Sequence, residues 1–531
     1  MARATLRFCG AARTVTGSCY WLQTDQCSFL VDCGLFQGPK TLKELNYRPF
    51  PFDPPKIDFV LQTHAHIDHA GLLPKLSAHG FQGPIFATEG TKDLLTFMLP
   101  DSGYIQEMEV SQLNIRNLRH GKPEVEPIYT RQDAEDCLAL FKTVDYQAWI
   151  TVGAGVRARF WNAGHILGSA SIEIEIDQEN AAPLRLLFSG DIGPDNKLFH
   201  PDPEAPSDFD YVISEATYGG RERPDVTPAA RKGALRQEVV NALDHNGMLL
   251  IPIFAVERTQ ELITDLIALQ DAGDIPKVPI FLDSPLAIRV TRVFQRHAPD
   301  LEDLGPAPRL TSNPTVRPTE TAEQSKQIAK VTGGAIILAA SGMCEAGRIR
   351  HHLKQWLWQE KATVLFVGYQ AIGTLGRILS EGAKSVKIHG QEIRVKARIR
   401  KIDTYSGHAD GSELVDWIVE RRPIKQALIL THGEEPQMLA LKSALIETGF
   451  TEKDILIPEL DDDITLGGEG ASVLAPSSDQ RLPPEALGGP DWHNDLTELI
   501  FDLRDTFEQA ADEKARAKVL RRIRRALEEG D

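Results

Sequence analysis

Short apolar runs that end in a polar residue or a glycine recur along the first 215 residues of this 531-residue chain. They occur at residues 28–32, 59–63 and 184–188. Runs of this length are typical of buried strands, and polar loops follow them. We therefore expect an α/β arrangement whose functional side chains lie on loops after the strands.

Longer helical patterns alternate with apolar runs from residue 217 onward. The runs at 247–252, 335–339 and 363–367 have the length and composition of strands. Because helices and strands that alternate in this way are typical of βαβ units, we predict a separate α/β domain over 217–385. Strand patterns resume over 386–465.

The C-terminal region has two different compositions. Residues 466–490 are rich in Gly, Pro and Ser, which predicts a linker. Residues 491–531 have the apolar spacing of a helical extension. Seven lysines and arginines crowd the stretch 514–525. A basic helix can bind RNA or a protein partner, and a solvated helix face accounts for the same pattern equally well.

Composition and charge limit the function classes. The 42% of hydrophobic residues is ordinary for packed globular domains. A formal net charge of −17 argues against a protein that coats nucleic acid with its whole surface. A local basic cleft, or bound metal ions, can still neutralise phosphates. Six cysteines without a CxxC pair indicate reduced thiols. With neither a signal peptide nor a long apolar span in the sequence, we predict a cytoplasmic protein without a membrane partner.

The strongest chemical signal is the His-x-His-x-Asp-His spacing within residues 63–71. For a chain with 15 histidines this pattern arises by chance about once in a thousand such sequences. A loop after a strand can turn His64 and His66 toward one metal ion and Asp68 and His69 toward a second. The alternative is a solvated polar loop with incidental histidines.

Two metal ions need more ligands than these four residues. His165 lies between Gly164 and Gly168, and Asp191 follows Gly190 directly, so each can occupy a tight turn at the end of a strand. Taken alone, a single histidine is more often structural, and an aspartate beside glycine is usually part of a turn. Their significance lies in completing a ligand set.

The order of these residues resembles a known family. The series Asp32, His64 to His69, His165 and Asp191 resembles motifs one to four of the metallo-β-lactamase fold. Further segments resemble its β-CASP branch of RNA-processing nucleases, which includes the nuclease subunit of the eukaryotic cleavage and polyadenylation specificity factor and bacterial and archaeal relatives. These segments are 8–18, 214–219, 253–261, 340–348, 368–377, 405–410 and 430–434.

The resemblance implies an αββα sandwich with an inserted α/β domain. Residues 1–216 would form the first part of the metallo-β-lactamase domain, 217–385 the β-CASP domain, and 386–465 the second part of the metallo-β-lactamase domain. A chain that returns to the first domain after a long insertion can bring a distant ligand to the same site.

The resemblance also implies two zinc ions per chain. Asp191 would bridge them, and Asp32 would orient a ligating histidine from outside the ligand set. The first ion would be held by His64, His66 and His165. The second would be held by Asp68, His69 and His432.

The implied reaction is hydrolysis of phosphodiester bonds in single-stranded RNA. A hydroxide activated by the two metal ions, with Asp68 among the catalytic residues, would leave 5′-phosphate and 3′-hydroxyl ends. His408 would protonate the leaving 3′ oxygen and Glu215 would orient it. The resemblance leaves open whether cutting is endonucleolytic or 5′-to-3′ exonucleolytic. It is also compatible with a homodimer.

The β-CASP segments suggest contacts with phosphate. Ser341 and Gly342 could offer hydroxyl and backbone N–H donors, and Arg258 and Arg377 could bind phosphates. Packing between domains is an equally good account of the two arginines. Glu257 departs from the family pattern, which usually has glycine before the arginine.

Three other function classes compete. A lactamase or thioesterase of the same fold would lack the long insertion and the His408 and His432 pair. A catalytically silent RNA-binding scaffold would have lost ligands, and every matched ligand is present here. A DNA nuclease is the nearest alternative, and His432 favours RNA because the DNA-directed branch typically has valine there.

Overall fold

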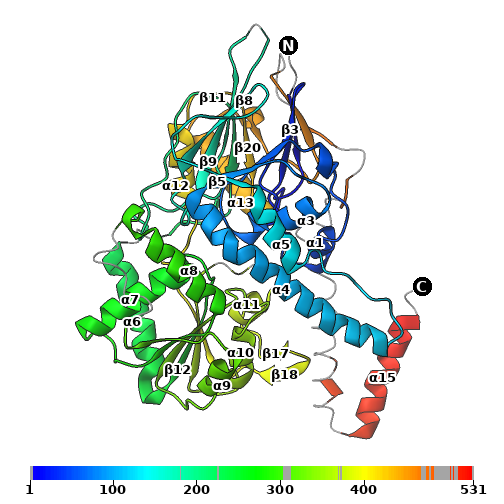
Figure 1. The fold of residues 1–531 in the computed structure, drawn as a ribbon. Helices are drawn as coiled ribbons and strands as arrows, with labels where there is room; N and C mark the ends of the chain where they lie inside the picture. The colour runs from blue at the N-terminus through cyan, green and yellow to red at the C-terminus, as the bar shows by residue number, and fades with distance from the viewer. Residues whose placement is uncertain are drawn as a thin grey trace.

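The computed structural model describes most of the chain. The described residues are 4–179, 181–223, 227–302, 313–368, 370, 373–467, 474–476, 480–482, 503, 506–507 and 512–528. Three large sheets and one hairpin organise them. Figure 1 places two sheets in the upper half of the molecule and the third in the lower half.

The first sheet has eight strands in the order β23-β22-β1-β2-β3-β4-β5-β6. The runs predicted at 28–32 and 59–63 form its central parallel pair. The other strands of this sheet come from both ends of the chain. The strands are β1 (Ala4–Phe8), β2 (Tyr20–Gln23), β3 (Ser28–Val31), β4 (Phe59–Leu61), β5 (Ile85–Thr88), β6 (Phe141–Val144), β22 (Asp463–Leu466) and β23 (Leu474–Ala475).

The second sheet has seven strands in the order β21-β20-β11-β10-β9-β8-β7. The run at 184–188 forms β10, which pairs in parallel with β11, and β11 pairs in parallel with β20. The strands are β7 (Ile150–Gly153), β8 (Val156–Asn162), β9 (Ala170–Ile176), β10 (Leu184–Phe188), β11 (Phe209–Glu215), β20 (Ile424–Thr431) and β21 (Ile455–Leu456).

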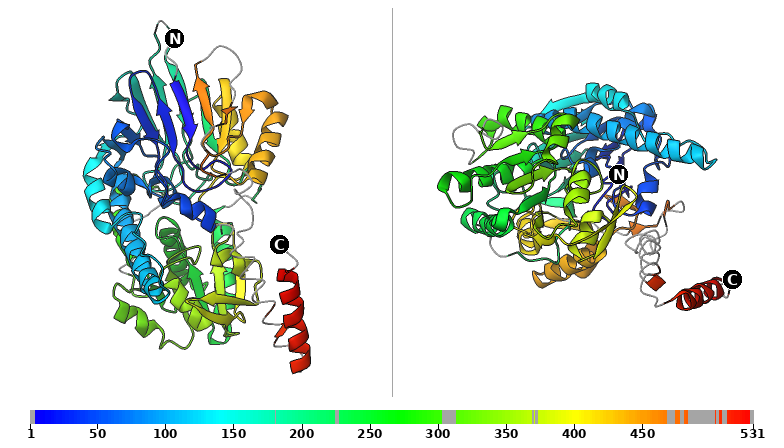
Figure 2. Two further views of the ribbon diagram at one scale, coloured as in Figure 1. Left: turned by 90° about the vertical axis from the view of Figure 1, so that its right-hand side faces the viewer. Right: turned by 90° about the horizontal axis from the view of Figure 1, so that it is seen from below.

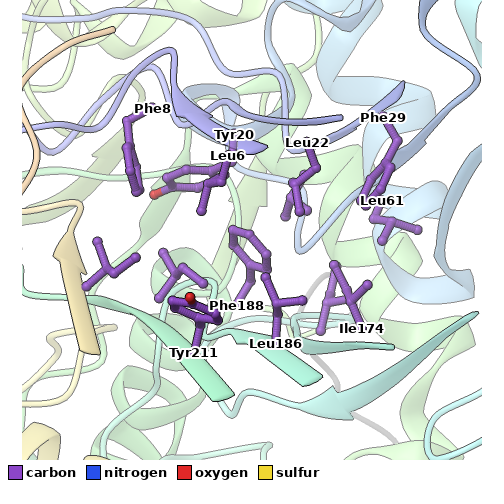
Figure 3. Packing of buried hydrophobic residues seen from close by; sticks show 14 of the residues in the cluster. Leu6, Phe8, Tyr20, Leu22, Phe29, Leu61, Ile174, Leu186, Phe188 and Tyr211 are labelled. Carbon is purple, nitrogen blue, oxygen red and sulfur yellow. The ribbon is translucent and has the colours of Figure 1, made fainter. Parts of the chain in front are cut away.

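The two sheets pack face to face over one apolar core. Figure 3 shows Leu22 and Phe29 of the first sheet above Leu186 and Phe188 of the second, and all four are at most 1% exposed. Alternate strand positions point inward, so both sheets contribute side chains to this layer. Burial of these side chains removes apolar surface from water, which is the main stabilising contribution to the sandwich.

Helices cover the outer faces of both sheets. On the first sheet they are α2 (Ile67–Ala70), α3 (Leu73–Ala78), α4 (Glu89–Arg119) and α5 (Arg131–Cys137), and a buried cluster joins α3, α4 and α5 to the strands. The short helix α1 (Lys40–Leu45) instead buries Leu42 and Leu45 in the core between the sheets. On the second sheet, buried residues of α12 (Gly411–Glu420) and α13 (Glu435–Glu447) pack against the strands. The layers therefore confirm the predicted αββα sandwich.

The third sheet is parallel, in the order β14-β13-β15-β12-β16-β19. Helices before and after its strands make the predicted βαβ units. The strands are β12 (Met248–Pro252), β13 (Ile280–Leu282), β14 (Val316–Pro318), β15 (Ala335–Ala339), β16 (Ala362–Phe366) and β19 (Arg398–Lys401). The helices are α6 (Pro228–Leu243), α7 (Arg258–Ala272), α8 (Pro285–Arg296), α9 (Ala322–Ile328), α10 (Ile349–Trp356) and α11 (Leu375–Ser380).

The strand pairing corrects one predicted boundary. β19 pairs in parallel with β16, so the third sheet extends to Lys401 and does not end at residue 385. The hairpin of β17 (Ser385–Ile388) and β18 (Gln391–Arg394) precedes β19. The chain returns to the sandwich only after this last strand.

The stretch predicted as a linker is partly ordered structure. β23 extends the first sheet, and Leu482 is only 8% exposed. The Arg481 guanidinium donates to the buried Asp461 carboxylate, with 2.8 Å between Nη2 and Oδ1, which fixes this segment to the sandwich. Within the predicted tail, α15 (Glu513–Glu528) is helical, and residues 483–502 lie outside the described part.

The helix α4 connects the two halves of the molecule. The Thr88 side chain caps its N-terminus by accepting the Thr91 N–H. In Figures 1 and 2 it runs from the sandwich alongside the third-sheet domain. Its Asp93 bonds His297, which follows α8, with 2.9 Å between Oδ2 and Nε2. None of the described helices is long and apolar enough to cross a bilayer.

The core between the two sheets predicts a large difference between two leucines. Leu186→Ala removes a fully buried side chain and should lower the free energy of unfolding by about 2–5 kcal/mol. Leu118→Ala on α4 removes a side chain that is 76% exposed and should change it by less than about 0.5 kcal/mol. Urea titration followed by tryptophan fluorescence measures both. Equal effects would contradict the packing.

Candidate metal centre

The candidate site lies where several strands end at one edge of the sandwich. Asp32 follows β3 and His64 follows β4, and these two strands are parallel. Asp191 follows β10 and His432 follows β20, with the parallel β11 between them. Because parallel strands end at the same edge, residues far apart in the sequence meet here.

Among the described residues, three overlapping groups of side chains offer ligand atoms within 4.8 Å of one another, and the third, Asp191, Glu215 and His432, shares two members with the others. The first group consists of His64, His66, His165 and Asp191, and the second of Asp68, His69 and His432. The structure thus brings together all seven residues that the sequence singles out as ligands, in the same two sets.

Asp191 lies between the two groups. Its Oδ2 is 3.4 Å from His64 Nε2 and 3.5 Å from His165 Nε2. Its Oδ1 is 3.1 Å from His69 Nε2 and 3.6 Å from His432 Nδ1. One carboxylate therefore faces a different histidine group with each oxygen, as a bridging ligand must.

Burial controls the charges in the site. It holds the pKa of His165 well below its ordinary value, lowers that of His66 to about 3 and lowers that of His64. These imidazoles are therefore neutral at pH 7, which is the form that binds metal. Burial opposes ionisation of Asp191, but the surrounding histidines, His432 and His69 first, hold its pKa well below that of an ordinary aspartate.

The donor set fits a metal ion. Among the described residues, His64 Nε2 and Asp191 Oδ1 are buried and make no hydrogen bond. The nitrogens His66 Nδ1 and His165 Nε2 lie only 3.1 Å apart. Neutral imidazole nitrogens that face each other repel unless a proton or a cation lies beside them. Imidazole and carboxylate donors at such a point suit zinc or a similar transition metal.

Hydrogen bonds from outside the two groups hold the imidazoles in place. Asp32, which adopts φ 58°, accepts from the Thr63 N–H and from His69 Nδ1, 2.7 Å away. His165 Nδ1 donates to the Gly407 carbonyl at 2.6 Å. These partners fix which nitrogen of each ring faces the centre. Asp32 thus lies where an orienting residue is expected.

Three supporting residues were missed at the sequence level. Thr217 places its hydroxyl 3.1 Å from His432 Nδ1. Lys197 Nζ donates to the His165 carbonyl, and Gly407 supplies the acceptor for the ring of His165. Thr217 lies within the family-like segment 214–219 and could have been found there. Lys197 carries no sequence signal, because its role depends only on tertiary contacts.

His408 and Glu215 form a pair beside the ligand groups. His408 Nδ1 is 3.1 Å from each carboxylate oxygen of Glu215, and its Nε2 is 3.9 Å from Asp191 Oδ2. Glu215 also accepts the Ile192 N–H at 2.6 Å, so the carboxylate itself is fixed. The imidazole therefore points Nε2 toward the centre while Nδ1 is held from behind.

The centre opens into a cavity of about 660 Å³ between the sandwich and the third-sheet domain. Ser341, Gly342 and Arg258 line it, as predicted for phosphate contacts. Arg377 is not among its lining residues: the side chain bonds Glu381 on the outer part of α11. The structure therefore does not bring Arg377 to the site, because its helical neighbour holds it elsewhere.

Glu257 has a structural reason for replacing glycine. It adopts φ 66°, a conformation that favours glycine. Its carboxylate lies 2.9 Å from His200 Nε2 and accepts the Leu167 N–H at 3.3 Å. These contacts join α7 to the loop that carries His165 and offset the backbone strain. They also place Arg258 at the cavity wall.

An αββα sandwich with a histidine and aspartate centre at its strand ends defines a metal-dependent hydrolase of the metallo-β-lactamase class. Family models agree: the metallo-beta-lactamase superfamily matches residues 12–245, the Beta-Casp domain 259–379, and the Zn-dependent metallo-hydrolase RNA specificity domain 392–458. The chain belongs to the β-CASP family of this superfamily.

Curated relatives support the same assignment. Ribonuclease TTHA0252 of Thermus thermophilus is 36% identical over 446 residues, which cover 83% of this chain and 95% of the relative. Transcription termination factor FttA of Methanosarcina mazei is 29% identical, with 82% and 68% covered. The FttA of Thermococcus kodakarensis is 31% identical, with 82% and 67% covered.

The position of Asp191 predicts a loss of metal. Asp191→Ala removes the carboxylate that both histidine groups share, so the purified variant should lose most of its transition metal. Asp195→Ala removes an exposed carboxylate four residues away and should keep the wild-type content. Elemental analysis by mass spectrometry measures both proteins, purified without chelator. Full metal content in Asp191→Ala would show that Asp191 is not a ligand.

Proposed function

We propose that this protein is a ribonuclease that holds two zinc ions per chain and hydrolyses phosphodiester bonds in single-stranded RNA. The observation that carries the proposal is the buried Asp191 carboxylate, which turns one oxygen toward each histidine group beside an open cavity. The cavity and the ligand groups together suit a phosphodiester that is attacked by water.

The choice of RNA rests on two supports. The match to an RNA specificity domain covers residues 392–458, which include His408 and His432, and a relative that is aligned over 95% of its length is named a ribonuclease. His432 also takes part in the second ligand group, whereas valine at that place could not. A DNA nuclease would be the alternative outcome of the same assay.

The ligand groups assign the residues that would hold zinc. His64, His66 and His165 would bind one ion, Asp68, His69 and His432 the other, and Asp191 both. When bound, the ions would lower the pKa of water toward about 7 and neutralise charge on the phosphate. The chain's own task is to fix these side chains, which Asp32, Thr63, Thr217 and Gly407 do through the hydrogen bonds described above.

His408 is the proposed general acid. The leaving 3′ oxygen needs a proton when the phosphodiester bond breaks, and an imidazole whose Nε2 points at the centre can donate it. Glu215 holds the opposite nitrogen, so the ring keeps this orientation. The products are then a 5′-phosphate and a 3′-hydroxyl.

The wall formed by the inserted domain would bind the phosphates on either side of the bond that is cut. Ser341 contributes a hydroxyl and Gly342 lies close to Phe254, where a Cβ would be 2.5 Å from the ring. Arg258 has a side chain that is 11% exposed and a buried Nη1 without a hydrogen-bond partner among the described residues. The nearest carboxylate oxygen, Glu261 Oε2, lies 3.8 Å from Nη1, so this nitrogen can still donate a short hydrogen bond to a phosphate oxygen.

The proposed substrate is tested directly with end-labelled single-stranded RNA and DNA of the same sequence. We expect cutting of RNA, no comparable cutting of DNA, and loss of activity with a chelator that returns when zinc is added. Positions of the labelled products distinguish cutting within the strand from cutting at the 5′ end. Preferred cutting of DNA would contradict the choice of RNA, and chelator-resistant cutting would contradict the metal centre.

The roles proposed for His408 and His432 separate in a paired experiment. His408→Ala should keep its metal and slow RNA cutting by about 10²–10⁴-fold, the usual range for loss of a general acid. His432→Ala should lose metal, because this imidazole belongs to the second ligand group. His120→Ala, an exposed histidine at the end of α4, serves as the control and should change neither quantity.

A substrate with sulfur in place of the leaving 3′ oxygen gives an independent readout. A thiolate needs little protonation, so this substrate should restore most of the activity of His408→Ala and much less of that of His432→Ala. Loss of metal from His408→Ala, or no relative gain with sulfur, would contradict the role of His408 as the acid.

A further inference from the structure

One face of the helix α4 lines the catalytic cavity over four turns. Eight of its residues contribute: Met98, Asp101, Ser102, Ile105, Gln106, Glu109, Val110 and Leu113. Their spacing alternates between three and one, which keeps every one of them on the same side of the helix. With a rise of 1.5 Å per residue, this face extends for ~22 Å. We call it the α4 wall.

The α4 wall differs in charge from the rest of the cavity. It contains no lysine or arginine and has two carboxylates, Asp101 and Glu109. The lysine and arginines that line the cavity are Lys43 of α1, Arg258 and Arg348, and the last two belong to the third-sheet domain. The third-sheet wall also carries Glu257, Asp283 and Glu345, but these pair with His200, Arg348 and Lys43. Arg258 is thus the basic group through which that wall would attract a phosphate, whereas the α4 wall offers no cation.

The α4 wall also carries an unused hydrogen-bond acceptor. Gln106 Nε2 donates to Ser102 Oγ at 3.3 Å, and Tyr129 donates to the same oxygen at 2.8 Å. Gln106 Oε1 is buried and makes no hydrogen bond with any described residue. A buried carbonyl oxygen without a partner is unfavourable unless a ligand supplies a donor.

Apolar side chains lie on the same face of α4 as this acceptor. Ile105, Met98, Val110 and Leu113 supply flat apolar surface, and burial raises the pKa of Asp101 and of Glu109. A nucleobase presents an apolar face and an edge with N–H donors, so it matches such a mixture. A phosphate offers neither an apolar face nor an N–H donor.

We propose that the α4 wall binds the nucleobases of the RNA strand, while the phosphates turn toward Arg258 on the opposite wall. This inference rests on the proposed function, because it assigns an orientation to that substrate. Single-stranded RNA is commonly recognised through splayed bases in this manner. Gln106 Oε1 accepts an N–H from the edge of one base, and the apolar residues contact the faces of its neighbours.

The test is a series of short RNA substrates, each with one base removed to leave an abasic ribose at a different position around the cut. The full-length zinc-loaded protein should lose at least about fivefold in kcat/KM at the positions that lie against the α4 wall, the loss expected for one base contact. Removal of bases elsewhere should have little effect.

In Gln106→Ala the contact to one base is already missing. Removal of that base should therefore cause no further loss of kcat/KM, so the abasic profile should be flat at this one position. The variant's dependence on salt concentration should stay that of the wild type, since no phosphate contact changes. Gln112→Ala replaces an exposed glutamine of α4 outside the cavity and should reproduce the wild-type profile. Gln106→Met, which keeps the length of the side chain but removes the acceptor, provides a second variant with the same expected profile if Gln106→Ala does not fold.

Two outcomes separate this inference from the proposed function. Absence of any cutting of unmodified RNA would overturn the proposed function and the inference with it. Efficient cutting with a flat abasic profile would overturn the inference alone. The inference is equally overturned if the α4 variants keep the full wild-type profile, or if they reduce the slope of activity against salt as loss of a phosphate contact would.

Discussion

A buried carboxylate surrounded by histidines is the feature on which the rest of the site depends. Asp191 is 2% exposed and has the imidazoles of His64, His165, His69 and His432 around its two oxygens. A charge removed from water in this way is tolerated only when it is paired or bound to metal. That requirement explains the arrangement of the site. The ligand groups and His408 place donors around the Asp191 carboxylate, and the hydrogen bonds behind them hold those donors in position.

The fold satisfies the requirement by bringing distant strand ends together. β10, β11 and β20 are parallel neighbours, although more than two hundred residues separate β11 from β20. The intervening chain forms the third sheet, which closes the cavity from the other side and supplies Arg258 and Ser341. Glu257 joins this domain to the loop of His165 through Leu167 and His200. The inserted domain thus contacts the loop that carries a candidate metal ligand. Both walls of the cavity are therefore positioned relative to the same ligands.

Much of this arrangement was predictable, and the remainder depended on tertiary contacts. The spacing from His64 to His69 and the short apolar runs are local features, so they predicted a metal site and buried strands. The αββα sandwich and the place of His432 came from the resemblance to a known family. Arg377 was expected at the cavity, yet it binds Glu381, which lies four residues further along the chain. This spacing is a local signal of a helical charge pair. The ordered segment around Arg481 was hidden by a composition typical of linkers. The α4 wall escaped notice because its polar and apolar residues alternate along one face, which gives no amphipathic signal.

The central claim is that Asp191 joins two metal ions held by separate histidine groups. Anomalous diffraction from crystals of the zinc-loaded protein, with data on both sides of the zinc absorption edge, tests it most directly. We predict two zinc peaks, one among His64, His66 and His165 and one among Asp68, His69 and His432, with the Asp191 carboxylate bound to both. A single peak, or two peaks of which neither contacts Asp191, would contradict the account.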